Sequence, residues 1–362
     1  MRNLFSYLYI GLLILGVICV AIATYLWRQH SPTDAGPFAV AAFVCFALGI
    51  RNFTSIKGLS YTLWIFAAVI AAMFYPATFQ SYGSFEFKTL IVPLLQLIMF
   101  GMGTAMSLQD FAGVIKMPKG VLIGVLCQFT IMPFVGLAIA QGFGFAPEIA
   151  AGIILVGSSP SGLASNVMSF IAKANLALSV TLTAVATALA PIMTPFLMQQ
   201  LAGQYVPIDF LAMMWSTTKI VIIPIVAGLL FNHFLSGKAK WLDNAMPLVS
   251  MVSIAIIITI ITAAGREDLL KIGGLLILAC LMHNLLGYVL GYGACKVMGM
   301  DQKSCRTIAL EVGLQNAGLA SGLALTMGKL ATVGLAPAIF GPMMNITGSG
   351  LATWWRGREP ID

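Results

Sequence analysis

Apolar residues dominate this sequence in long runs, and short polar gaps between the runs hold most of the charged residues. Most runs are about 17 to 25 residues long, the length of a helix that crosses the hydrocarbon core of a bilayer. Helices satisfy all their backbone hydrogen bonds internally, as lipid requires. The pattern predicts twelve membrane-spanning helices, at Leu4–Trp27, Pro37–Ile50, Tyr61–Tyr75, Leu90–Met106, Gly120–Ala140, Ile149–Ala172, Leu176–Met198, Phe210–Phe234, Met246–Ala264, Ile272–Val297, Thr307–Met327 and Val333–Trp355.

The composition indicates an all-α polytopic membrane protein, since 59% of the residues are hydrophobic and only 9% are charged. Soluble domains carry about 25% charged residues. The net charge of +7 therefore reflects membrane topology and not a nucleic-acid partner. With the N-terminus in the cytoplasm, the predicted spans place thirteen Lys and Arg residues inside and five outside. This is the bias of the positive-inside rule. It predicts a multi-pass plasma-membrane protein with both termini cytoplasmic.

Residues 1–52 form an N-terminal extension that we expect to hold two transmembrane helices. A cleaved signal peptide is the alternative for the first, because residues 21–23 read Ala-Ile-Ala, which resembles a cleavage site. The run is longer than the apolar region of a signal peptide, which favours a retained helix.

A faint internal repeat divides the rest of the chain. The sequence Gly-Leu-Ala-Ser at residues 162–165 recurs at 318–321, which is 156 residues later, and the same shift maps neighbouring spans onto one another. We therefore predict two five-helix units, residues 60–203 and 208–358. An odd number of helices inverts the second unit in the membrane. Inverted repeats with interrupted helices at matching positions are typical of secondary transporters.

Two of the predicted spans contain residues that interrupt a helix. Residues 157–166 hold two glycines, a proline and four serines, and residues 310–320 hold Gly313 and Gly318 among polar side chains. An opened backbone in the membrane must be satisfied by protein, water or ions. Where two such helices cross, free carbonyls can coordinate a cation, and helix N-termini can face an anionic ligand.

Glu311 stands out among the 12 acidic residues because it alone lies deep in a membrane-length apolar run. Placing a charged side chain in the bilayer centre costs at least about 2.5–3.5 kcal/mol, so such a residue is a functional candidate. A hard cation is the natural partner of a carboxylate surrounded by other oxygens. The alternatives are a purely structural polar network at Glu311, and close helix packing for the serines and glycines. We interpret His283 and Asn284 as a polar packing pair.

Several motifs resemble those of the bile acid:sodium symporter family, over roughly residues 60 to 358. They are Met-Phe-Gly-Met-Gly at 99–103, Gln-Phe-Thr-Ile-Met-Pro at 128–133, Ala-Ser-Asn-Val-Met at 164–168, Asn-Leu-Ala-Leu-Ser-Val at 175–180 and Glu-Val-Gly-Leu-Gln-Asn at 311–316. The resemblance implies a ten-helix unit with a panel domain and a core domain. The panel contains its helices one, two, six and seven, and the unwound fourth and ninth helices cross in the core.

The resemblance also implies two sodium sites, which share Glu311. Matched residue by residue, the first site consists of Ser165, Asn166, Ser179, Thr183 and Glu311. The second consists of Gln128, Glu311, Gln315 and the backbone carbonyls of Val312 and Leu314. Residues expected at the substrate are Asn316, Leu163 and Met344. Relatives that take bile acids carry Thr and His at the last two positions, so bile acids in particular do not follow from the resemblance.

The buried carboxylate and the resemblance together predict sodium-coupled symport of an organic anion, either bile-acid-like or a smaller carboxylate or sulfonate, and the resemblance implies two sodium ions. A proton-coupled carrier of the same fold, with Glu311 as the proton site, is the alternative. An intramembrane enzyme is a third class. An aspartyl protease needs two membrane carboxylates and Glu311 stands alone, while no glycine-flanked serine motif specifies a Ser/His protease. We therefore predict a transporter and not an enzyme.

Overall fold

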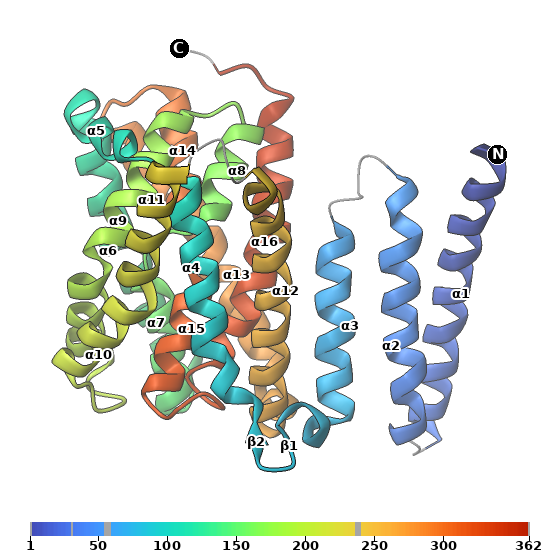
Figure 1. Ribbon diagram of the computed structural model, residues 1–362. Coiled ribbons are helices and arrows are strands. Elements are labelled where there is room, and N and C mark those ends of the chain that lie inside the picture. The colour runs from blue at the N-terminus through green and yellow to red at the C-terminus, as the bar shows by residue number, and fades with distance from the viewer. Residues whose placement is uncertain (1, 30–31, 54–58, 236–239, 361–362) are drawn as a thin grey trace. The chain divides into compact units, whose positions relative to one another are not determined.

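The computed structural model describes residues 2–29, 32–53, 59–235 and 240–360 of this 362-residue chain. Most of the described residues are helical, as the hydrophobic pattern predicts (Figure 1). The chain divides into two compact units. The first is Met1–Leu90 with Met251–Glu267, and the second is Ile91–Ser250 with Asp268–Asp362.

The first unit is built from helices that pack in sequence order. Its elements are α1 (Arg2–Arg28), α2 (Pro32–Gly49), α3 (Ser60–Phe74), the hairpin of β1 (Ser81–Tyr82) and β2 (Phe85–Glu86), and the end of α12 (Lys240–Ala264). Helix α2 packs against both α1 and α3. It begins at Pro32 and not at Pro37 as predicted, since proline fits the first turn of a helix, where the N–H has no helical partner. The Tyr61 hydroxyl donates to the Met251 carbonyl at 2.9 Å, which joins α3 to α12.

The second unit holds the remaining helices. They are α4 (Ile91–Ala105), α5 (Leu108–Lys116), α6 (Pro118–Phe143), α7 (Pro147–Gly157), α8 (Leu163–Ile171), α9 (Leu176–Leu197), α10 (Phe210–Thr217), α11 (Ile223–Leu235), α13 (Arg266–Val297), α14 (Gln302–Gly313), α15 (Ala317–Thr326) and α16 (Leu335–Arg356), with the start of α12. Side-chain caps mark two of the helix starts: Asn175 accepts from the Leu178 N–H at 3.1 Å, and Asp301 from the Ser304 N–H at 2.9 Å.

Eight helices among the described residues are long and apolar enough to cross a membrane, against twelve predicted spans. They are Tyr7–Arg28, Thr33–Asn52, Phe87–Ala105, Pro118–Phe143, Leu176–Ala202, Phe210–Phe234, Ala245–Ala264 and Arg266–Val297. The other four predicted spans are not among these eight. Helix α3 has only 15 residues, and two of the spans are the interrupted helices. Helix α16 is less apolar, because it contains Pro342, three glycines and several polar residues. The protein is thus an all-α polytopic membrane protein, while the total of twelve spans and the inverted repeat stay predictions.

Candidate functional site

Two interrupted helices meet inside the second unit. Helix α7 ends at Gly157, and α8 begins at Leu163. Between them lies Pro160, which has no N–H and whose ring clashes with the helical carbonyl four residues earlier. Helix α14 ends at Gly313, where an added Cβ would lie 2.2 Å from the Tyr288 ring, and α15 begins at Ala317. Both interruptions therefore fall where the sequence predicts them.

The two interrupted segments satisfy each other's backbone groups. The Asn316 N–H donates to the Pro160 carbonyl at 2.8 Å, and the Gly162 N–H donates to the Leu314 carbonyl at 3.3 Å. Ser161 and Gln315 form an antiparallel bridge between the segments. This pairing replaces helical hydrogen bonds that lipid could not supply. It also brings the C-terminal ends of α7 and α14 and the N-terminal ends of α8 and α15 to one place.

Glu311, in the last turn of α14, points its carboxylate into a cluster of hydroxyl groups. The side chain is only 2% exposed. Its Oε2 accepts from the Ser161 hydroxyl at 2.6 Å, and its Oε1 accepts from the Ser179 hydroxyl at 2.5 Å. The Thr183 hydroxyl lies 3.2 Å from Oε1 and 3.0 Å from Oε2. Ser179 and Thr183 come from α9, so the segment between α7 and α8 and helix α9 both reach a carboxylate at least 128 residues away in the sequence.

Oxygen atoms outnumber hydroxyl hydrogens in this cluster. The Ser179 oxygen lies 2.5 Å from Glu311 Oε1 and 2.9 Å from Asn166 Oδ1, but a hydroxyl has one hydrogen to donate. The Thr183 oxygen lies 3.1 Å from the same Asn166 Oδ1 and also near both Glu311 oxygens. Ser165 lies 3.3 Å from Thr183, and it donates to the Gly162 carbonyl at 2.7 Å. With the Asn166 amide oxygen on this side of the cluster, its lone pairs and those of the two α9 hydroxyls face one another with no hydrogen between them, which suits a hard cation.

Among the residues that the structure describes, no basic side chain forms an ion pair with the Glu311 carboxylate. Among the described residues, the ion pairs are Lys88–Glu86, Lys173–Glu359, Arg266–Glu267 and Lys329–Glu148, and none involves Glu311. The residues predicted for the first sodium site, Ser165, Asn166, Ser179, Thr183 and Glu311, thus lie together around one buried carboxylate. Their oxygens fit the preference of sodium for several oxygen ligands with little net ligand charge.

The residues predicted for the second sodium site also lie together, but their oxygens are mostly bonded to N–H groups. Gln128 Nε2 donates to Gln315 Oε1 and to the Ser159 carbonyl, each at 2.9 Å. Gln315 Nε2 donates to the Val312 carbonyl at 2.5 Å, and the Leu314 carbonyl accepts from Gly162. The exception is Gln128 Oε1, which is buried with no partner among the described residues. No described hydrogen bond joins Glu311 to Gln128 or Gln315. Unlike the first set, most oxygens of the second set therefore already accept a hydrogen bond within the protein.

The three residues predicted at the substrate occupy different elements. Asn316 is buried, and its side-chain oxygen caps α15 by accepting from the Leu319 N–H at 3.0 Å. Leu163 is the first residue of α8, and Met344 is buried in α16. None of the described hydrogen bonds joins one of these three residues to another. Leu163 and Asn316 flank the paired segments, and α8 packs against α16.

Two contributors to this site were missing from the sequence prediction. Ser161 donates directly to Glu311, whereas the family motif begins at Ala164. Asn284, expected to be a packing residue, donates to the Gly313 carbonyl at 2.8 Å and so gives a partner to a carbonyl at the buried C-terminal end of α14. Its neighbour His283 contacts the Met132 carbonyl at 2.9 Å. The cluster of serines beside Pro160 was the one signal that could have suggested Ser161. Nothing in the sequence around Asn284 indicates its partner.

A helical membrane protein with two interrupted helices paired around a buried carboxylate has the architecture of a secondary transporter. Residues 92–272 match the Sodium Bile acid symporter family. The chain is 38% identical over 307 residues to the uncharacterized sodium-dependent transporter YocS of Bacillus subtilis, covering 84% of this chain and 94% of that protein. It is 33% identical over 302 residues to the probable sodium/metabolite cotransporter BASS1, chloroplastic, of Arabidopsis thaliana, covering 83% and 74%.

A third relative matches more of the chain: the probable BASS1 cotransporter of Oryza sativa is 30% identical over 349 residues, covering 92% of this chain and 84% of that protein. This chain therefore belongs to the sodium bile acid symporter family, as its motifs predict. It is a multi-pass membrane protein from a family of sodium-dependent transporters, and the family implies sodium and a small solute as its transported species.

Proposed function

We propose that this protein is a sodium-coupled symporter of a small organic anion, bile-acid-like or a smaller carboxylate or sulfonate, that works by alternating access. The observation that carries this proposal is the hydrogen-poor oxygen cluster around Glu311, which holds a buried negative charge with no basic partner among the described residues. At about 4 Å and an effective dielectric near 20, a unit-charge pair gains roughly 4 kcal/mol. A bound sodium ion would therefore offset the cost of burying the carboxylate.

The first sodium ion would lie between Glu311, Asn166 and the hydroxyls of α9. The second would lie near Gln128 and Gln315, where Gln128 Oε1 is the available ligand and Val312 and Leu314 would have to release their N–H donors. The organic anion would bind on the side of Asn316, Leu163 and Met344. There the N-terminal ends of α8 and α15 provide the positive end of a helix dipole. Sodium would order the paired segments first, so the anion would meet a site that is already assembled.

The topology that goes with this proposal places both termini in the cytoplasm of a bacterium. Lys and Arg residues support it, because most of them lie at predicted cytoplasmic loops. The panel and core domains, moving against each other, would expose the Glu311 cluster to the two sides in turn. Residues 1–52 lie outside the ten-helix unit, and we assign them no part in the transport step.

Thermal stability of the purified protein in detergent tests the proposal, with sodium titrated against equal potassium for the native chain and Glu311→Gln. A ligand of the folded state stabilises it by about 2.7 kcal/mol at one hundred times its Kd. We expect sodium to raise the melting temperature of the native chain and to leave that of Glu311→Gln unchanged. Equal melting temperatures in sodium and potassium for the native chain would overturn the proposal. A stability that follows pH instead would then favour proton coupling.

A further inference from the structure

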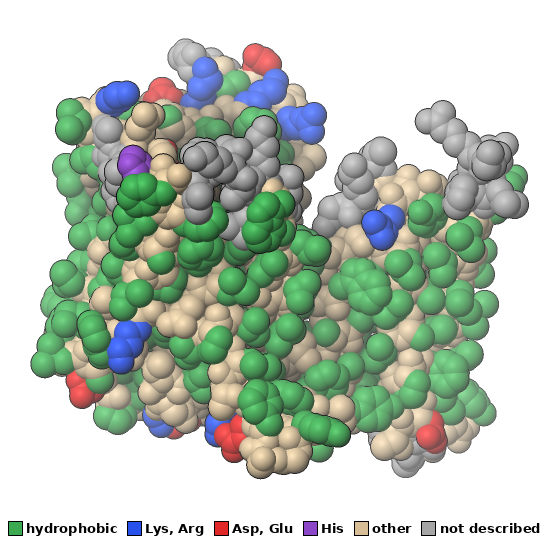
Figure 2. Space-filling model, viewed as in Figure 1, with side chains coloured by type: hydrophobic (Ala, Val, Ile, Leu, Met, Phe, Trp, Pro, Cys, Tyr) green, Lys and Arg blue, Asp and Glu red, His purple; other side chains and the backbone are tan. Residues whose placement is uncertain are grey.

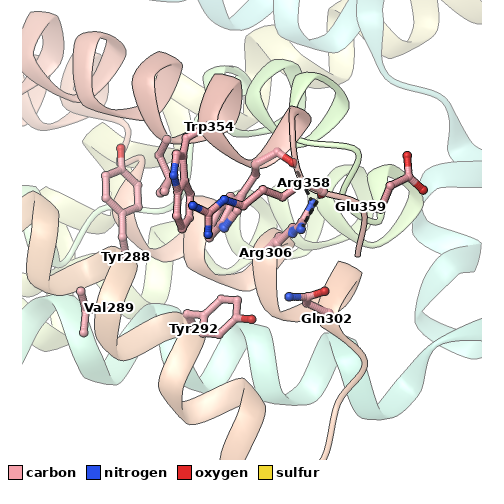
Figure 3. A pocket seen from close by; sticks show the side chains of 10 residues that line it. Tyr288, Val289, Tyr292, Gln302, Arg306, Trp354, Arg358 and Glu359 are labelled. Atoms are coloured by element: carbon pink, nitrogen blue, oxygen red, sulfur yellow. Dashed lines mark hydrogen bonds between the residues drawn. The ribbon is translucent and has the colours of Figure 1, made fainter. Parts of the chain in front are cut away.

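A pocket of about 460 Å³ lies at the end of the second unit where α13, α14 and α16 meet (Figure 3). Its walls carry two arginines, two tryptophans and two tyrosines, together with apolar side chains. It shares no residue with the Glu311 cluster. Figure 2 shows Lys and Arg side chains gathered at this end of the unit, near the described C-terminal residues. The positive-inside rule assigns this end to the cytoplasmic surface of the membrane.

Arg306 forms the buried wall of the pocket, with only 1% of its surface exposed. Its Nη1 donates to the carbonyls of Ala172 and Trp355 at 3.1 and 3.2 Å, and its Nη2 donates to the Arg358 carbonyl at 2.9 Å. Two N–H groups remain, one on Nη2 and the Nε–H, and the Nε atom is buried with no partner among the described residues. The pocket wall therefore offers a buried, positively charged donor that the protein itself does not use.

Arg358 provides a second guanidinium at the mouth of the pocket. It is exposed, and its guanidinium carbon lies 4.1 Å from the centroid of the Trp354 ring. Figure 3 shows the two side chains beside each other. Stacking on an indole leaves the edge of a guanidinium free to donate hydrogen bonds, and the planar fork matches a phosphate oxygen pair. No ion pair among the described residues involves Arg358. Its charge is thus available to an external anion.

One carboxylate, Glu359, also lines the pocket and would oppose an anion. It is already paired with Lys173, with 3.0 Å between Nζ and Oε1. The Lys173 hydrogen bond holds the pKa of the Glu359 carboxyl below its ordinary value, so Glu359 is ionised around pH 7 and its charge is offset by the ion pair with Lys173. In Figure 3 the Glu359 carboxylate points away from the two guanidinium groups. The net field in the pocket is therefore positive.

The other side of the pocket opens onto an apolar helix face. Val289 lines the pocket and is 66% exposed, and Leu285 and Leu286, about one turn earlier on the same face of α13, are 46% and 36% exposed. On a membrane protein such a face contacts lipid chains. Tryptophan and tyrosine beside basic residues are typical of the level of the lipid headgroups. Basic pockets between transmembrane helices at this level bind anionic headgroups.

We propose that this pocket binds the phosphate of an anionic phospholipid, with Arg358 and the Arg306 Nε–H as donors and with the acyl chains along α13. The phosphate is the shared chemistry of a lipid headgroup and of a soluble phosphate ester, and the exposed apolar face beside Val289 favours the lipid. The inference does not depend on the proposed sodium coupling, since it uses residues outside the Glu311 cluster.

The test uses the full chain in maltoside detergent, with native mass spectrometry and thermal melting. Phosphatidylglycerol is compared with phosphatidylcholine of the same acyl chains, and with glycerol phosphate as the soluble arm. The variants are Arg358→Gln and Trp354→Leu. The matched control is Arg356→Gln, an exposed arginine two residues away that does not line the pocket. Sodium-induced stabilisation is measured in every sample, so that failure of the lipid site is distinguishable from failure of sodium coupling.

We expect retained phosphatidylglycerol on the native chain and on Arg356→Gln, and an apparent affinity about tenfold weaker for Arg358→Gln. Trp354→Leu should weaken binding in the same direction. Equal retention of the two lipids by the native chain would overturn the proposal, and so would an equal loss in Arg356→Gln. Stabilisation by glycerol phosphate that equals that of phosphatidylglycerol would show a site for a soluble anion, which also contradicts it.

Discussion

Helix α14 carries two buried charged side chains of opposite sign, Arg306 and Glu311, which are 1% and 2% exposed. They lie five positions apart and do not pair with each other. Arg306 donates to three backbone carbonyls near the C-terminal ends of α8 and α16. Glu311 instead accepts from side-chain hydroxyls of Ser161, Ser179 and Thr183. The same burial is thus achieved with two different kinds of partner.

The difference lies in whether the partners can change role. A carbonyl can only accept, and carbonyls at a helix C-terminus carry the negative end of the helix dipole, so they compensate Arg306 permanently. A hydroxyl can donate to a bare carboxylate or turn its lone pairs toward a cation. The surroundings of Arg306 therefore belong to the fold, whereas those of Glu311 can serve two states. This is the property that a transported ion requires of its binding site.

The largest effect should come from Arg306→Met, which removes the donor of three carbonyls. Each buried group left without a partner costs about 1–3 kcal/mol, so we expect the free energy of unfolding to fall by about 3 kcal/mol or more. Thermal melting in detergent measures this, with the exposed Arg356→Met as control. The sodium-dependent rise in melting temperature should persist in the folded fraction. If the free energy of unfolding of Arg306→Met equalled that of the native chain, the surroundings of Arg306 would not stabilise the fold, and the contrast with Glu311 would be lost.

A smaller effect is expected from Thr183→Ala, which deletes one of the oxygens near Glu311. Loss of a single ligand from a set of several should weaken the apparent sodium affinity about tenfold, close to 1.4 kcal/mol. Sodium titration of the melting temperature measures it. Thr187 is the matched control: it lies one turn along α9, is buried, and its hydroxyl oxygen has no hydrogen-bond partner among the described residues. A sodium affinity lowered equally in Thr187→Ala would indicate a general packing effect on α9.

The smallest effect concerns Glu311→Gln in potassium without sodium. The neutral amide avoids the cost of burying a charge, about 2.5–3.5 kcal/mol. It also loses hydrogen bonds to a charged group, each about 1.5–3 kcal/mol. We expect these two effects to offset each other. The free energy of unfolding of Glu311→Gln should therefore lie within about 1 kcal/mol of that of the native chain, or above it. If Glu311→Gln lowered the free energy of unfolding as much as Arg306→Met does, Glu311 would be a structural residue as well.

Much of this fold could be read from local patterns. The apolar runs identified a helical membrane protein, and glycines with Pro160 located both interrupted helices. Glu311 was recognisable because its burial in an apolar run is costly whatever surrounds it. The family motifs then identified Asn166, Ser179 and Thr183, which the structure brings to that carboxylate. The prediction of twelve spans exceeded the eight long apolar helices, since length and hydropathy do not describe an interrupted helix well.

Partners across the fold depended on tertiary structure alone. Four serines lie between residues 158 and 165, and composition cannot say which of them faces Glu311. In the folded chain the Ser159 hydroxyl donates to the Leu155 carbonyl of the preceding helix α7, while the Ser161 hydroxyl donates to Glu311, 150 residues away. Arg306 looked like an ordinary charge of a cytoplasmic loop, and only the packing of α8 and α16 around it shows that it is buried. Periodicity and breakers are local properties of a chain, whereas the direction of a side chain in an unwound segment is set by what packs against it.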